Sequence, residues 1–146
     1  MRLLTLAILL FLAPLAAAQE ETPAKPSKPT VDDVPALLEQ MAENDYAGKA
    51  AMEQIVEVGQ PAVPLLVRAL KSKSPRVRYW SIAALSGIGG EEARQAILHM
   101  LDDRAAFVRS VAVWHLRRWI EDDEVRKAVL EQLKDENALV RGWVLK

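Results

Sequence analysis

The strongest constraint on the fold is a short signature that occurs three times, a leucine followed seven residues later by Val-Arg. The copies begin at Leu70, Leu101 and Leu133, so they lie 31 and 32 residues apart. A fixed period of this length is typical of stacked helical units, each too small to bury its apolar face alone. We therefore expect a quasi-one-dimensional array whose surface holds a partner.

Helical periodicity continues through the chain after Val31, and no alternating strand pattern interrupts it. Turn residues such as Gly59-Gln60-Pro61 and Ser74-Pro75 separate the apolar segments. The pattern predicts eight helices, over residues 35–43, 45–58, 61–71, 75–88, 91–101, 105–120, 122–134 and 137–146. Short connections make successive helices antiparallel neighbours. We expect an all-α fold, an α-solenoid of about three and a half hairpins in a right-handed superhelix.

The repeated unit has the order L-x-D, a turn, and V-R-x-x-A-x-x-x-L, best seen from Leu101 to Leu116. This pattern resembles HEAT repeats, and its short period is similar to the HEAT-like variety named after phycobilisome lyases. Residues 61–146 carry the clear copies, and residues 31–60 resemble a degenerate first copy without Val-Arg. The resemblance implies a solenoid that binds proteins.

Aspartate precedes arginine by six residues in two copies, at Asp103 and Arg109 and at Asp135 and Arg141. This spacing puts the carboxylate in the interhelical turn and the guanidinium one turn into the next helix. A charge-assisted bond can then lock the hairpin, and neighbouring repeats can extend it into a ladder. Ser72 replaces the aspartate in the first clear copy, so we expect Arg78 to be free. We interpret these residues as structural, with ligand binding as the alternative.

The second helix of each hairpin presents two faces. Counted from the valine of Val-Arg, offsets zero, three, four, seven, eight and eleven form a stripe that packs between the layers. Offsets two, five, six and nine point elsewhere, and the resemblance implies that second helices line the concave side. The candidate partner contacts there are Tyr79, Ile82, Val113, Trp114 and Arg117. An exposed apolar cluster beside an arginine is typical of a binding hot spot; the alternative is that the superhelix buries some of these side chains.

Residues suited to metal binding or catalysis have simpler explanations. His99 lacks a second ligand at the right spacing, and His115 falls on the buried stripe. The acidic run 121–124 begins a helix, where capping and the helix dipole favour carboxylates. No nucleophile–base–acid set and no phosphate-binding loop can be assembled. We expect no metal, no cofactor and no enzyme activity.

The N-terminal residues have the pattern of an export signal. A basic start at Arg2, an apolar run from Leu3 to Leu12 and a small-residue exit predict a signal peptide over residues 1–18, cleaved after Ala18. An uncleaved anchor is the alternative, but the apolar stretch is shorter than the roughly twenty residues of a spanning helix and contains a proline. Residues 19–31, rich in proline and lysine, predict a disordered linker before a repeat domain at 32–146.

The chain contains no cysteine, which excludes a cysteine-linked lipid anchor, disulfides and thiolate-bound zinc. Its formal net charge is −1, and loss of Arg2 with the signal peptide would make it −2. This balance gives no global attraction to nucleic acid. We expect a periplasmic or secreted protein without stable membrane insertion after cleavage.

Together these features predict a non-catalytic exported scaffold that binds a protein or peptide through its second-helix face. The alternative is a subunit or enzyme of the HEAT-like lyase type that carries a small ligand, which a deep pocket with convergent polar groups would favour. Leu85 and Leu116 occupy the same inward position and should be fully buried. The segment after Val140 is shorter than its counterparts, which predicts self-association through the C-terminal end or a longer array.

Overall fold

The computed structural model describes residues 27–146, and within them it contains helices and no strand. The eight α-helices are α1 (Val34–Glu43), α2 (Asp45–Val58), α3 (Val63–Ala69), α4 (Pro75–Ile88), α5 (Glu91–His99), α6 (Ala106–Leu116), α7 (Asp123–Glu131) and α8 (Ala138–Val144). The eight predicted helices are therefore confirmed. The predicted signal peptide over residues 1–18 and most of the predicted linker lie outside the described residues.

Several α-helices adjoin a single 3₁₀ turn. Three such turns, Met100–Asp102, Arg117–Trp119 and Gln132–Lys134, fall where the sequence predicted continuous helix. Gln60–Ala62 overlaps the predicted start of the helix over 61–71, and Val31–Asp33 precedes the predicted helix over 35–43. A 3₁₀ turn supplies partners for terminal backbone groups that an α-helix leaves without any. The predicted boundaries thus mark the helical segments correctly but not where α geometry ends.

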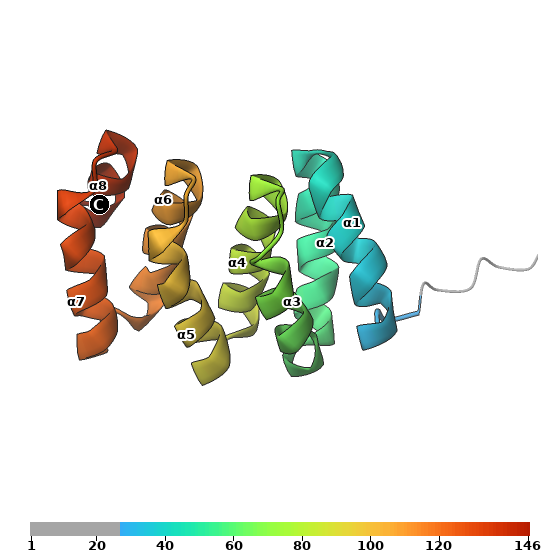
Figure 1. Ribbon diagram of the computed structural model, residues 1–146. Helices are drawn as coiled ribbons and strands as arrows, with labels where there is room; N and C mark the ends of the chain where they lie inside the picture. Colours follow the sequence, from blue (N-terminus) through green and yellow to red (C-terminus); the bar gives the residue numbers. More distant parts are fainter. Residues whose placement is uncertain (1–26) are drawn as a thin grey trace, which may run out of the picture.

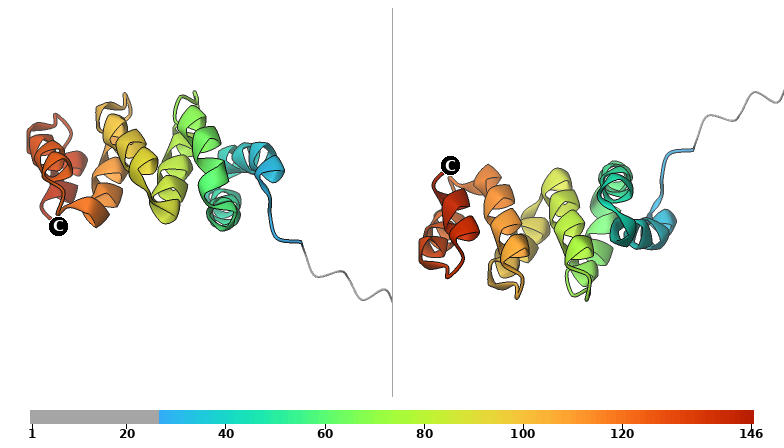
Figure 2. Two further views of the ribbon diagram at one scale, coloured as in Figure 1. Left: turned by 90° about the horizontal axis from the view of Figure 1, so that it is seen from below. Right: turned by 90° about the horizontal axis from the view of Figure 1, so that it is seen from above.

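The four helical hairpins lie side by side in one row, from α1–α2 at one end to α7–α8 at the other (Figure 1). The two further views show the same row from below and from above (Figure 2). The second helices form a continuous layer, because α2 packs on α4, α4 on α6 and α6 on α8. The first helices contact one another much less. This is an all-α solenoid whose second helices are the more closely packed layer.

The signature valines and the predicted inward leucines form the core between these layers. Val108, Val140, Leu85 and Leu116 are all completely buried, which confirms the predicted register of the second helices. Trp80 belongs to the same core, and its indole packs closely against Gly48 of α2. A Cβ atom at Gly48 would fall 2.1 Å from Trp80 Nε1, so only glycine permits this close approach.

Polar side chains and a glycine cap the helix ends. The Asn44 side chain accepts a hydrogen bond from the Ala47 amide at the start of α2, and the Ser74 side chain accepts one from the Val77 amide at the start of α4. Gly59 follows α2 with a φ of 73°, a conformation that side chains disfavour. No helix within residues 27–146 is long and apolar enough to cross a membrane.

Candidate partner-binding site

An open groove of about 1260 Å³ runs along the second helices. Every second helix contributes to its lining, and α7 adds a wall at the C-terminal end. Representative lining residues are Met52, Val56, Tyr79, Trp114, Arg118 and Leu130. Sites for drug-sized ligands typically occupy roughly 300–1,000 Å³ and enclose most of the ligand. This groove is larger and open, and its lining is mainly apolar, so its shape suits an extended segment.

Trp114 and Leu130 are the two most exposed large apolar side chains that line the groove. About half of Trp114 is accessible (49%), although it contacts two other rings. Its ring meets the His115 ring edge-on at 4.6 Å between centroids and the Trp143 ring at 6.4 Å. Arg117, predicted as its neighbour, is exposed in the same lining. The structure therefore brings together two of the predicted partner contacts in an accessible place.

Tyr79 lines the same groove and is partly buried. Its ring stacks on Phe107 of α6 at 5.3 Å between centroids. Burial, and secondarily the charge of Asp45, raises the pKa of the Tyr79 hydroxyl, so this group stays neutral. Phe107 is half exposed and was not among the predicted contacts. It lies seven residues before Trp114, and this spacing puts both rings on one face of α6. The sequence could therefore have identified Phe107 as a second exposed aromatic residue on that face.

Ile82 and Val113 are not partner contacts. Both are completely buried, so the prediction that they belong to an accessible cluster is wrong. The reason lies in the packing between repeats: α4 contacts both α2 and α6, and α6 contacts both α4 and α8. Neighbouring second helices therefore cover the faces on which these two residues lie. Burial of part of the cluster was the alternative interpretation, and it applies here.

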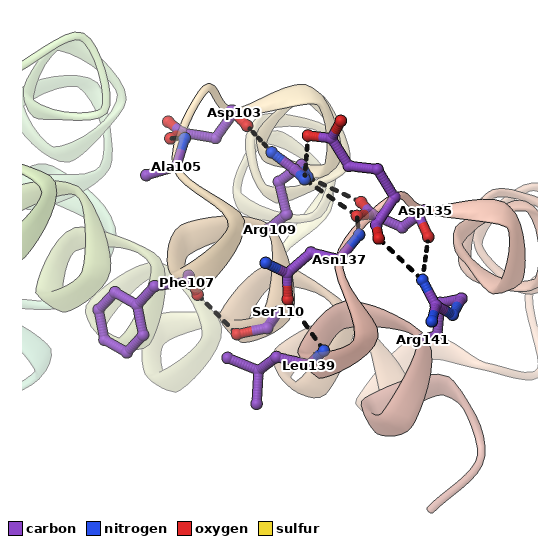
Figure 3. A network of polar contacts seen from close by, with 10 residues as sticks. Asp103, Ala105, Phe107, Arg109, Ser110, Asp135, Asn137, Leu139 and Arg141 are labelled. Carbon is purple, nitrogen blue, oxygen red and sulfur yellow. Dashed lines mark hydrogen bonds and ion pairs between the residues drawn. The ribbon is translucent and has the colours of Figure 1, made fainter.

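The Asp/Arg ladder links successive repeats through its carboxylates, and each arginine also binds a backbone carbonyl in the turn of its own hairpin. Arg109 donates from Nε and Nη2 to both carboxylate oxygens of Asp135, at 2.7 and 2.9 Å, and from Nη1 to the Asp103 carbonyl at 2.9 Å (Figure 3). The predicted partners six residues apart do meet, but through the backbone carbonyl. The hydrogen bond from Arg109 holds the pKa of Asp135 below its usual value.

Arg78 is not free, which corrects the prediction drawn from Ser72. Its Nη1 donates to the Ser72 carbonyl at 2.8 Å, so no aspartate is needed at that position. Its carboxylate partner is Asp103 of the following repeat, bound at 2.7 and 2.8 Å. Arg141 repeats the backbone part of this pattern, with bonds to the carbonyls of Asp135 and Glu136 (Figure 3). These contacts hold the turns of successive repeats together. None of the ladder residues lines the groove.

The charged residues that line the groove are unevenly distributed. Glu53 of α2 is the lining's carboxylate, and it pairs with Lys49 at 3.8 Å. Three of its cations, Arg117, Arg126 and Lys146, belong to segments at the C-terminal end, and the fourth, Arg118, reaches back to α4. Arg118 Nη1 donates to the Ser86 carbonyl, and its guanidinium lies 5.1 Å from the centroid of the Trp119 ring. One end of the groove is therefore basic.

His115 is the histidine that lines the groove, and burial lowers its pKa from 6.5 to about 4. It is therefore uncharged at neutral pH. His99 lies outside the groove, with Nδ1 2.7 Å from the Gln95 carbonyl oxygen. Within residues 27–146, no three carboxylate or histidine side chains are placed to hold a metal ion. The Asp122 side chain accepts from the backbone amides of Glu124 and Val125, as expected for a helix cap.

Comparison with known proteins adds information on the fold. The family model described as HEAT repeats matches residues 34–117, which extend from the start of α1 into the 3₁₀ turn after α6. The matched region contains most of the groove-lining helices. No curated protein matches the chain.

Proposed function

Because the chain belongs to the HEAT-repeat family, a class of helical repeat scaffolds suited to protein interaction, we propose that it is a non-catalytic scaffold that binds a segment of another protein. The bound segment lies in the groove along the second helices. Membership of the family supports the general role of protein binding. The open, mainly apolar groove supports the proposed location of the bound segment.

The observation that carries this proposal is the exposure of Trp114 within an apolar groove that lies open to solvent. A tryptophan leaves about half of its surface exposed here while neighbouring rings fix its orientation. Binding hot spots are enriched in tryptophan, tyrosine and arginine, and all three line this groove. A preoriented aromatic side chain also loses little conformational entropy on binding.

The chemistry of the groove supports binding rather than catalysis. Its histidine, His115, lies against the Trp114 ring, and its imidazole is uncharged at neutral pH. A general acid or base needs a pKa near the working pH and a partner that orients it. A small-ligand enzyme would require a deeper pocket with convergent polar groups, whereas this lining is mainly apolar.

We also propose that the protein acts in the periplasm or outside the cell. The support is the N-terminal pattern of basic start, apolar run and alanine exit, together with the absence of cysteine. N-terminal sequencing of the mature protein from a periplasmic fraction tests this proposal. A mature start at Gln19 is expected, and retention of Met1 in the cytoplasm would contradict export.

Selection of random peptides displayed on phage tests the binding proposal. Peptides are selected on the full chain and then compared on Trp114→Ala and Tyr46→Ala. Tyr46 is a matched control because it is exposed (87%) on α2 and does not line the groove. We expect enriched peptides to bind wild type and Tyr46→Ala equally and to lose binding on Trp114→Ala. Equal binding to all three proteins would reject the groove.

A further inference from the structure

We infer that the partner segment is acidic at one end and apolar at the other, and that it lies in the groove with its carboxylates over Arg117 and Arg118. This inference rests on the proposed function, because it specifies the chemistry of the segment that the groove would bind.

The two ends of the groove differ in character. Toward the N-terminal end the lining consists of side chains such as Met52, Val56 and Ala83, from α2 and α4. Toward the C-terminal end the arginines follow Trp114 by three and four residues, one helical turn further along the chain. A segment that satisfies both ends must itself be chemically asymmetric.

Two of the arginine charges at the basic end, those of Arg117 and Arg118, are not neutralised within residues 27–146. Arg126 pairs with Asp123, but neither Arg117 nor Arg118 forms an ion pair with a carboxylate of the described chain. The carbonyl bonded to Arg118 orients its guanidinium without cancelling the charge. Both residues are exposed, so a ligand can reach them. This local excess of positive charge occurs in a chain whose overall formal charge is −1.

A peptide carboxylate matches this arrangement better than other anions do. Guanidinium groups bind carboxylates through two parallel hydrogen bonds, and low-dielectric apolar walls strengthen the field inside a groove. A nucleic acid would need a basic track along its whole length. Here the basic residues occupy one end, and the other end carries apolar side chains and Glu53.

Fluorescence anisotropy with three short fluorescein-labelled peptides tests the inference on the full chain. The peptides share a Leu-Trp-Leu end and carry four glutamates, four glutamines or four lysines at the other end. We expect the glutamate peptide to bind about tenfold or more tightly than the glutamine peptide, and the lysine peptide to bind most weakly. The preference should shrink as salt is added.

Charge reversal locates the effect. Arg117→Glu should abolish the preference for the glutamate peptide, whereas Arg68→Glu should preserve it. Arg68 is a matched control because it is exposed on α3 and does not line the groove. Equal affinity for the three peptides, or binding of none of them, would overturn the inference. So would a poly-dT oligonucleotide that competes as effectively as the glutamate peptide.

This outcome can be separated from failure of the proposed function. If phage-selected peptides depend on Trp114 but show no preference for acidic residues, only the chemistry assigned to the partner is wrong. If no selected peptide depends on Trp114, the groove itself is rejected.

Discussion

Arg78 and Asp103 form a two-point ion pair between successive repeats, with side chains only 4% and 7% exposed. The same arginine holds the Ser72 carbonyl, and the same aspartate accepts from the Ala105 amide. One pair therefore ties together the turn of its own hairpin and the turn of the next. Arg109 and Asp135 repeat the arrangement one unit further along.

Removal of Asp103 should destabilise the fold strongly. Asp103→Ala leaves the buried guanidinium of Arg78 without its counter-charge, which typically costs about 3–5 kcal/mol. Asp102→Ala, at the exposed neighbouring position, should change stability by less than about 0.5 kcal/mol. Urea denaturation followed by circular dichroism measures both values. Similar midpoints for the two variants would show that the pair contributes little.

Truncation of Leu116 should also destabilise the array. This side chain is completely buried between the layers, and a buried Leu→Ala change costs about 2–5 kcal/mol. A loss of 1 kcal/mol lowers Tm by roughly 4–8 °C in a domain of 60–100 residues and by roughly 2–4 °C in one of 150–250 residues, and this domain lies between the two sizes. Leu145→Ala is the matched control because Leu145 is 77% exposed, and Glu131→Ala is a second exposed control. If Leu116→Ala melts with the controls, the register of α6 is incorrect.

Stability should decline in mildly acidic solution because of His115. Its pKa is about 4 in the folded protein and 6.5 in the unfolded chain, so the unfolded state binds the proton more readily. The stabilisation is complete above pH 6.5 and is lost as pH falls toward 4. The loss over this range is roughly 2–3 kcal/mol.

Substitution of His115 isolates this effect from the rest of the protein. His115→Gln should flatten the dependence of unfolding free energy on pH between 4.5 and 6.5, whereas the exposed His99→Gln should retain it. Below this range, protonation of carboxylates such as Asp135 adds a separate loss. An unchanged slope in His115→Gln would assign the pH dependence to other groups.

The sequence was sufficient to predict the eight helices, their antiparallel order and the buried positions of Leu85 and Leu116. These features follow from periodicity within one helix and from short connections, which are local properties. It was not sufficient to place Ile82, because burial there depends on how closely neighbouring repeats approach. The partner of Arg78 was missed for the same reason.

Contacts between repeats also shape the groove. Phe107 of α6 does not line the groove but stacks on the lining residue Tyr79 of α4, and Leu130 of α7 enters the lining although it belongs to a first helix. Neither contact can be deduced from offsets within one repeat. By contrast, the exposure of Trp114 was predicted correctly from its helical position alone.

Site-specific photo-crosslinking from position 130 in cells of the source organism tests the central claim most directly. A photoreactive benzoylphenylalanine replaces the exposed groove residue Leu130 in one strain and Tyr46 in a matched strain. If the groove binds a protein segment, irradiation at position 130 should give a discrete crosslinked species, and addition of Trp114→Ala should weaken it. Position 46 should not give that species. A chain that remains uncrosslinked at position 130, or that yields the same products from both positions, would contradict the account.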